Sequence, residues 1–145
     1  MRFVLTEDMI DDPLIKRRKE ISTKQKGRLL SLLMERSGGA CHYCDRPCHR
    51  HSLVSGKPPG QMATVEHLKT RHMGRRRYFD GGVVLSCQGC NLRMNKLEMR
   101  TRAGDKRAKS MLQEARLVAE IRYLMDQKPR NLTSGAPLAL NGLLR

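Results

Sequence analysis

The chain has 145 residues and a formal net charge of +15 at pH 7, because 29 Lys and Arg stand against 14 Asp and Glu. This length allows one domain with a modest core, and the charge favours a polyanionic partner, with nucleic acid as the leading candidate. An anionic membrane surface is the competitor, but the basic residues are spread along the chain instead of lying on one long amphipathic helix. Aromatic residues make up 3% of the chain and Trp is absent, so we expect contacts with the nucleic-acid backbone and grooves rather than stacked single-stranded bases.

The N-terminal segment MRFVLTEDMIDD has too short an apolar run for a signal peptide, and no segment has the length needed to cross a bilayer. We therefore expect a cytoplasmic protein with no membrane partner, in which paired cysteines bind metal more often than they form disulfides. Residues 1–37 are expected to form a basic N-terminal arm and a helix. The run KRRKE in this arm predicts a solvated helix face or a flexible segment, with a specific DNA contact as the alternative.

The predicted elements after the arm are a helix and two short strands. The helix is expected to begin after Ser22, a good N-cap residue, and to end at the Ser-Gly-Gly of residues 37–39. The stretch SGKPPG at 55–60 predicts a loop. Alternation over residues 62–67 then predicts one strand, and the apolar run VVLSC, which ends at Cys87, predicts the other.

Two more helices are predicted after the strands, from Asn91 to about Met99 and from Asp105 to about Gln127. In the second of these, residues at helical spacing are predicted to face the core: Met111, Ala115, Val118, Ile121 and Met125. The chain is thus expected to divide into four parts: an arm and helix at 1–37, a core at 38–100, an amphipathic helix at 101–128, and a tail at 129–145 that is disordered or docks at an edge.

The cysteines give the clearest motif. Four of the five form two CxxC pairs: Cys41 with Cys44, and Cys87 with Cys90. Two such pairs supply the four thiolates that a tetrahedral zinc ion requires, and a zinc ion held in this way has no open position, so we expect it to organise the fold and not to catalyse. Cys48 is left over, with His49 and His51 nearby. We expect a loop with exposed histidines there, with a second metal site as the alternative.

A Glu-His pair ends the first predicted strand, and an Asn follows the second CxxC. Hydrolysis of a phosphodiester needs an activated water and neutralisation of charge on the phosphate and the leaving oxygen. His67 suits the first task as a general base, and the oxygens of Glu66 and Asn91 suit a hard divalent cation such as magnesium or manganese. Because adjacent strand residues point to opposite faces, Glu66 and His67 share one site only if the strand breaks there.

The segments CHYC, VEHLKTRHMG and GGVVLSCQGCN, in this order, resemble the zinc-containing HNH endonucleases of the ββα-metal fold, which include endonuclease VII-like resolvases. The resemblance covers residues 38–95. It implies a structural zinc at the four paired cysteines, His67 as the general base, and Glu66 and Asn91 as ligands of a catalytic divalent ion. Asn95, one helical turn after Asn91 and on the same face, is a further candidate ligand. The family cleaves DNA, sometimes branched DNA, and many of its members belong to phages or mobile elements.

Some positions depart from the commonest pattern of this family. Thr70 stands where Pro is frequent, and Asn91 stands where the name-giving final histidine is expected. Gly82 stands where the family often has an Asn that orients the base histidine or its loop. Asp80 and Asn95 are the candidates to replace that Asn.

A basic loop separates the two catalytic segments. Its arginines are Arg71, Arg75, Arg76 and Arg77. Guanidinium groups suit phosphate oxygens, so we expect these residues to bind the nucleic-acid backbone, with a soluble surface as the alternative and no prediction of base readout. His72 is a candidate phosphate contact, with a solvated loop histidine as the alternative.

These features predict an α+β fold, with a small ββα-metal core and a four-cysteine zinc knuckle pair, flanked by N- and C-terminal helices. The expected function is metal-dependent endonucleolytic hydrolysis of DNA, duplex or branched, with RNA not excluded as a substrate. A homodimer is the form expected of a double-strand cutter with one site per chain. The alternative is a non-catalytic zinc module that binds nucleic acid, and the set Glu66, His67 and Asn91 separates the two, because a binding module does not need it.

Overall fold

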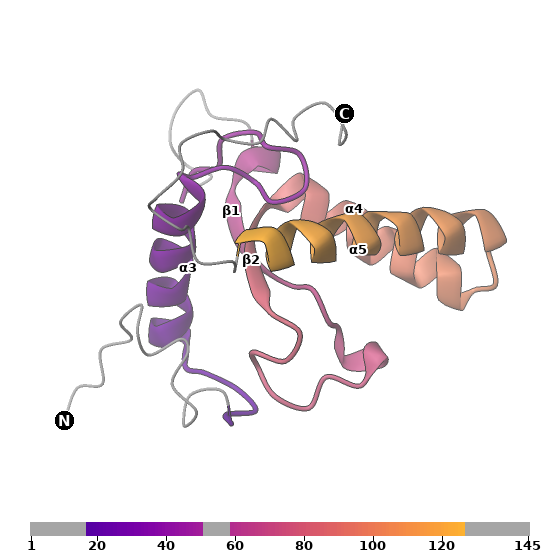
Figure 1. Ribbon diagram of the computed structural model, residues 1–145, viewed down its shortest axis with the longest axis horizontal. Helices are drawn as coiled ribbons and strands as arrows, with labels where there is room; N and C mark the ends of the chain where they lie inside the picture. Colours follow the sequence, from indigo (N-terminus) through magenta and orange to yellow (C-terminus); the bar gives the residue numbers. More distant parts are fainter. Residues whose placement is uncertain (1–16, 51–58, 127–145) are drawn as a thin grey trace.

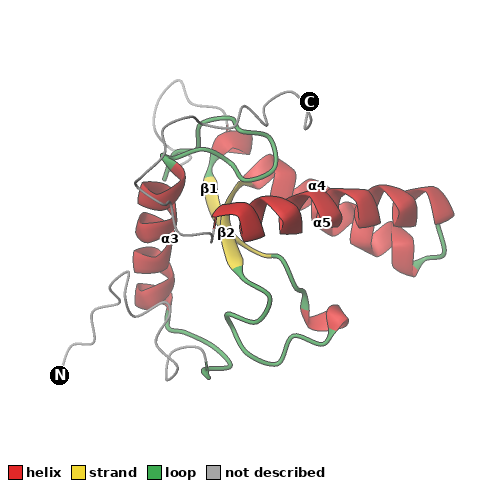
Figure 2. Cartoon of the chain, viewed as in Figure 1, coloured by secondary structure: helices red, strands yellow, loops and turns green. Residues whose placement is uncertain are grey.

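The computed structural model describes residues 17–50 and 59–126, and these residues form an α+β fold (Figure 1; Figure 2). Within this part of the chain, three α-helices flank a two-stranded antiparallel sheet, and two 3₁₀ turns, η1 (Pro59–Gln61) and η2 (Arg71–Met73), lie in the connections. The predicted α+β class is confirmed. No described helix is both long enough and apolar enough to span a membrane. The predicted tail at 129–145 and most of the predicted N-terminal arm lie outside the described residues.

Helix α3 (Thr23–Ser37) begins and ends where its sequence predicts. The Ser22 hydroxyl accepts the N–H of Gln25 at 3.3 Å, and the Gln25 side chain accepts the N–H of Ser22 at 2.9 Å, so the two residues form a capping box. Gly38 ends the helix with a left-handed backbone (φ 63°). Two buried leucines of α3 belong to the same apolar cluster as residues of both strands, so this helix covers one face of the sheet.

Strands β1 (Ala63–His67) and β2 (Val83–Cys87) pair antiparallel, with the first residue of each opposite the last residue of the other. Side chains alternate across a strand, so Ala63, Val65, Val83 and Leu85 pack on the α3 side. Thr64 and Glu66 lie on the side of α4 (Gln88–Arg102) and α5 (Lys106–Asp126). Figure 1 shows these helices on opposite sides of the hairpin. The sheet is therefore a partition between two separate side-chain environments.

Helix α4 (Gln88–Arg102) starts earlier than the predicted Asn91 and ends beyond the predicted Met99. The early start has a local cause, because the sulfur of Cys87 accepts the N–H of Cys90 at 3.4 Å and so acts as the N-cap. The second CxxC is thus joined to the first turn of a helix, which fixes the spacing of its two sulfurs.

Helix α5 (Lys106–Asp126) begins after Asp105, whose carboxylate accepts the Ala108 N–H at 2.9 Å, and lies alongside α4 (Figure 1). The two helices enclose a second buried cluster: Met94, Leu97, Ala108 and Leu112. The predicted core face of α5 is wrong for three of its members, because Met111, Ile121 and Met125 are exposed. Apolar residues lie on both sides of α5, so spacing alone did not identify the side that α4 covers.

Candidate zinc centre and active site

The four cysteines of the two CxxC pairs converge at one end of the hairpin. Their sulfur atoms all lie within 4.8 Å of one another, and Cys44 Sγ lies 3.9 Å from Cys87 Sγ. Tetrahedral zinc with bonds of about 2.3 Å to sulfur places its ligand sulfurs about 3.8 Å apart. The predicted clustering of these cysteines is confirmed, and the group can hold a metal ion such as zinc.

Backbone N–H groups support the thiolate form of Cys41, whereas burial raises the pKa of the Cys44 and Cys90 thiols. The sulfur of Cys41 accepts the N–H of Cys87 at 3.3 Å. Burial by itself raises the pKa of the Cys41 thiol, but hydrogen bonds from backbone N–H groups outweigh burial and lower this pKa to about 7. Zinc binds thiolates, so the local structure already favours the ligand form of this cysteine.

The first CxxC knuckle is also fastened to α5. His42 Nε2 donates to the carbonyl of Ala119 at 2.8 Å. Arg122 donates to the carbonyl of His42 at 2.8 Å and pairs with Asp45 at 3.1 Å. The cysteine cluster therefore lies where the hairpin, α4 and α5 meet, and one metal ion there would hold all three together.

The fifth cysteine, Cys48, lies outside this cluster and is half-buried. Within residues 17–50 and 59–126 it belongs to no group of metal-binding side chains. The prediction of exposed histidines beside it is wrong for His49, whose side chain is 6% exposed, because the backbone of His49 pairs with Gln61 and Ala63 next to the start of β1. His51 lies outside the described residues.

Glu66 and His67 end β1 and point to opposite faces of the hairpin. Both remain paired with β2, Glu66 with Val84 and His67 with Val83, so the strand break that a shared site requires does not occur. Two hollows lie at this end of the sheet. The α4–α5 hollow has a volume of about 160 Å³, and its polar lining includes Glu66, Asn95, Glu98 and Arg116. The α3 hollow is more open, has a volume of about 600 Å³, and is lined by Glu20, Lys26, Arg71, Arg75 and Tyr78 among others. His67 borders both.

His67 is an uncharged base among cations. Its ring packs edge-on against the ring of Tyr78, with 4.6 Å between centroids. Burial and the charges of Arg75 and Lys26 lower the pKa of His67 to about 4, against a hydrogen bond to the Tyr78 backbone that raises it. The Nε2 atom is buried and has no hydrogen-bond partner among the described residues. At neutral pH the ring is therefore uncharged, and no described residue occupies this nitrogen.

Glu66 is 8% exposed, and the nearby charge with the largest effect on it is another carboxylate, Glu98. Burial and the nearby charge of Glu98 raise the pKa of Glu66 to about 7, against the charge of Arg116. Glu98 lines the same hollow and pairs with Arg116 at 3.6 Å, and the carboxamide of Asn95 lies in this lining too. The α4–α5 hollow thus offers carboxylate and carboxamide oxygens, which are the ligands that magnesium and manganese take.

Asn91 lies on the first turn of α4 and points at the middle of β1. Its Nδ2 donates to Thr64 Oγ1 at 3.1 Å, and its Oδ1 accepts from Asn95 Nδ2 at 3.3 Å. Thr64 and Glu66 lie on the same strand face, about 7 Å apart along the strand. The structure therefore brings Asn91 and Asn95 to the same side of the sheet as Glu66, with Asn95 lining the hollow itself.

The position at which the family often has Asn is closed to any side chain. Gly82 has a φ of 93°, and a Cβ there would meet the ring of Tyr123 on α5 at 2.5 Å. The two predicted replacements do not orient His67, because Asp80 accepts backbone N–H groups of its own loop and Asn95 donates to a neighbour on α4. The ring of the histidine is held by its aromatic neighbour instead.

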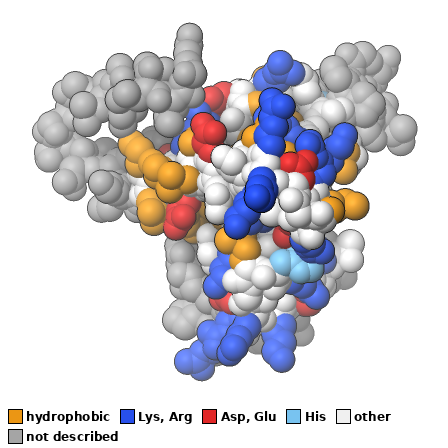
Figure 3. All heavy atoms as spheres, turned by 90° about the vertical axis from the view of Figure 1, so that its right-hand side faces the viewer, with side chains coloured by type: hydrophobic (Ala, Val, Ile, Leu, Met, Phe, Trp, Pro, Cys, Tyr) orange, Lys and Arg blue, Asp and Glu red, His pale blue; other side chains and the backbone are white. Residues whose placement is uncertain are grey.

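The loop arginines fall into two pairs. Arg71 and Arg75 line the α3 hollow, and Arg75 Nη1 is buried without a hydrogen-bond partner in the described part of the chain. Arg76 and Arg77 are exposed, as is His72. On the face that Figure 3 shows, Lys and Arg side chains are spread among the other side chains.

We compared the chain with protein-family models, curated proteins and solved structures, and none of the three gave a match. The resemblance to HNH endonucleases stays a prediction. Sequence reasoning missed Lys26, Tyr78 and Glu98, which reach the two hollows from α3, from the basic loop and from α4. No motif marks these residues, because only the packing of the helices on opposite faces of the hairpin brings them to the end of β1.

Proposed function

We propose that this chain is a metal-dependent endonuclease that hydrolyses phosphodiester bonds of nucleic acid, with His67 as its general base. The observation that carries the proposal is the state of His67: an uncharged imidazole, with a free buried nitrogen, at the border between a cationic hollow and a hollow lined by oxygen donors. A general base must be unprotonated at the working pH and must reach the reacting water. His67 meets the first condition and borders the space needed for the second.

The chemistry follows from these surroundings. His67 takes a proton from a water molecule, the resulting hydroxide attacks phosphorus, and the bond from phosphorus to the leaving oxygen breaks. Arg75, beside His67 in the α3 hollow, offers an unpartnered guanidinium nitrogen to a phosphate oxygen. The net charge of +15 supports binding of the polyanion that carries such phosphates.

The donors on the other side of the sheet fit a divalent cation. Glu66 and Asn95 bring oxygens into the α4–α5 hollow, and Asn91 lies outside its lining, hydrogen-bonded to Asn95. These three residues would hold magnesium or manganese. The raised pKa of Glu66 reflects burial beside the charge of Glu98, an environment that a bound cation relieves. When bound, such an ion would supply neutralisation of the charge on the leaving oxygen of a phosphate that lies at His67, the residue that borders both hollows.

We assign the four-cysteine cluster to structural zinc, because four thiolates leave no coordination position for substrate. The substrate class is DNA, duplex or branched, with RNA as the second nucleic acid to test. The alternative function, a non-catalytic zinc module that binds nucleic acid, is favoured by one observation: Glu66 and His67 diverge to opposite faces of an unbroken strand.

Cleavage of supercoiled plasmid and of a four-way DNA junction, with magnesium or manganese, tests the proposal. We expect cleavage by the parent chain and a loss of about 10² to 10⁴-fold in His67→Ala, with DNA affinity and zinc content unchanged. Added imidazole should restore part of the cleavage in this variant, which loss of structure alone would not allow. Undiminished cleavage by His67→Ala would remove this residue as the base. Binding without cleavage by the parent chain, on both DNA substrates and on RNA, would establish the binding module instead.

A further inference from the structure

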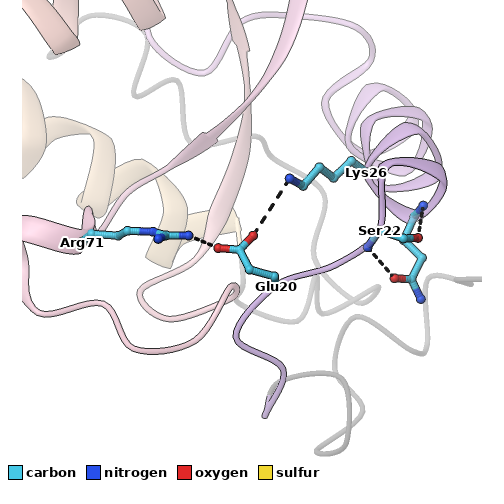
Figure 4. A network of polar contacts seen from close by, with 5 residues as sticks. Glu20, Ser22, Lys26 and Arg71 are labelled. Atoms are coloured by element: carbon cyan, nitrogen blue, oxygen red, sulfur yellow. Dashed lines mark hydrogen bonds and ion pairs between the residues drawn. The ribbon is translucent and has the colours of Figure 1, made fainter.

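Glu20 lies at the α3 hollow between two of its cations (Figure 4). One oxygen of its carboxylate pairs with Arg71 Nη2, and the other lies 4.0 Å from Lys26 Nζ. All three side chains are about half exposed or more. Ion pairs in this position are weak, since water competes for both partners, so the carboxylate can be exchanged for another anion.

The backbone on either side of Glu20 is fixed. The carbonyl of Arg18 accepts the N–H of Tyr78 at 2.8 Å. On the other side Ile21 is 7% exposed in the apolar cluster beneath α3, and Ser22 caps that helix. Release of the two cations therefore requires only rotation of the Glu20 side chain, with no movement of the chain that carries it.

The hollow holds more positive charge than Glu20 balances. Its lining includes three cations, Lys26, Arg71 and Arg75, against this one carboxylate. Arg75 is the least satisfied of the three: Nη1 is buried without a partner, and burial and the charge of Arg71 lower the pKa of its guanidinium. A group with more than one negative charge, or several acceptor oxygens, would satisfy these cations better than a single carboxylate does.

We propose that the α3 hollow binds a phosphate group of the nucleic-acid backbone, and that Glu20 is the internal carboxylate which this phosphate displaces from Arg71 and Lys26. The identity of the anion rests on the proposed function, whereas the cation cluster and its internal carboxylate do not. Glu20 neutralises part of the cluster in the free chain, so an entering anion must bind these cations more strongly than the carboxylate does. Phosphate does so because it also attracts Arg75, which lines the same hollow and which Glu20 leaves unpaired.

The test measures binding in the His67→Ala background without magnesium or manganese, so that no cleavage occurs. The probes are inorganic phosphate, followed by calorimetry, and a short labelled duplex DNA, followed by fluorescence anisotropy at fixed salt. We expect Glu20→Gln to tighten both by about three- to tenfold, since two exposed ion pairs no longer compete. Glu35→Gln, an exposed substitution near the other end of α3 with the same change of charge, is the matched control and should change phosphate binding little.

A second pair of variants tests the site from the cationic side. Lys26→Gln should weaken binding of inorganic phosphate several-fold, whereas Lys24→Gln, an exposed lysine of the same helix outside the hollow, should not. In Lys26→Gln the gain from Glu20→Gln should shrink, because one of the two competing ion pairs is already gone. Equal effects of Glu20→Gln and Glu35→Gln, or of Lys26→Gln and Lys24→Gln, would overturn the proposal and leave a general charge effect.

These outcomes are independent of catalysis. A parent chain that cleaves no nucleic acid, but in which phosphate binding depends on Glu20 and Lys26, loses the proposed function and keeps the anion site. A parent chain that cleaves through His67, but in which Glu20→Gln behaves as Glu35→Gln does, keeps the function and loses the displaced carboxylate.

Discussion

The two residues that end β1 are neighbours in the chain, yet the largest charge effects on their pKa values come from residues of opposite sign. His67 lies among Lys26 and Arg75, which help to lower its pKa to about 4. Glu66, one residue earlier, lies near Glu98, and burial and that charge raise its pKa to about 7. Burial favours the uncharged form of both groups, and a carboxylate near Glu66 and cations near His67 add to this effect. The difference shows that neighbouring residues of one strand can have dominant charges of opposite sign nearby, although Arg75 acts on both.

The partition is held from its other end, where the strands meet the four cysteines. Replacement of Cys90 by Ser should unfold both faces of the hairpin together. The cluster joins the first knuckle to the end of β2 and the start of α4, and His42 and Arg122 link that knuckle to α5. A structural zinc site is worth on the order of 10 kcal/mol, which is comparable to the whole stability of a small domain. We expect Cys90→Ser to lose about one zinc ion per chain and to unfold, measured by elemental analysis and by circular dichroism.

Cys48→Ser is the matched control for this experiment, since Cys48 lies outside the cluster. It should keep its zinc and its melting temperature. Chelation of the metal from the parent chain should reproduce the unfolding of Cys90→Ser. A chain that stays folded after complete removal of zinc would show that packing alone holds the two sides together.

A substitution at Gly82 should disturb only one side of the partition. Its φ of 93° is strained for any other residue, and a Cβ would meet the Tyr123 ring of α5 at 2.5 Å. We expect Gly82→Ala to lower the free energy of unfolding by about 2 to 4 kcal/mol, from backbone strain and overpacking together. Urea denaturation measures this loss.

Gly104→Ala separates the two causes. Gly104 has the same φ of 93°, but a Cβ there meets nothing within 4 Å, so this variant reports backbone strain alone. The excess loss in Gly82→Ala is the contact with α5. If Gly104→Ala loses as much, the approach of α5 to the hairpin does not limit this position, and the absence of the family's Asn there has another reason.

Local signals predicted the parts of this molecule that are governed locally. Ser22 and Gly38 predicted both ends of α3, and the spacing of the two CxxC pairs predicted the clustering of the four cysteines. The strand rule also stated in advance that Glu66 and His67 diverge unless the strand breaks. What the sequence did not reveal depends on packing between distant segments: the face of α5 that α4 covers, and the arrival of Lys26 beside His67.

The same packing determines which residue holds the ring of His67 in place. Tyr78 has no motif of its own, and its role follows from the loop that folds its ring against His67. In the sequence, Gly82 marks the absence of a side chain that could orient His67. In the structure, the lack of a side chain at Gly82 lets the ring of Tyr123 approach the hairpin. A motif comparison registers which side chain is absent, and only the fold shows what uses the space.

The smallest predicted effect is on the pH dependence of stability, to which Glu66 and His67 contribute in opposite directions. The folded pKa of Glu66, about 7, is above its ordinary 4.5, so its contribution to stability is complete below pH 4.5 and is lost as the pH rises to 7. The folded pKa of His67, about 4, is below its ordinary 6.5, so its contribution is complete above pH 6.5 and is lost as the pH falls to 4. In the parent chain these two trends oppose each other between pH 4.5 and 6.5.

Single substitutions should therefore reveal slopes that the parent chain conceals. Glu66→Gln leaves the His67 trend alone, so its stability should fall toward acid, and at pH 8 it should exceed the parent by about 1 to 3 kcal/mol more than it does at pH 4.5. His67→Gln leaves the Glu66 trend alone, so its stability should fall as the pH rises from 4.5 to 7. Urea denaturation of the three proteins at four pH values between 4.5 and 8 measures these slopes. Parallel curves would mean that both side chains are hydrated, so that neither burial nor the nearby charges shift their pKa values.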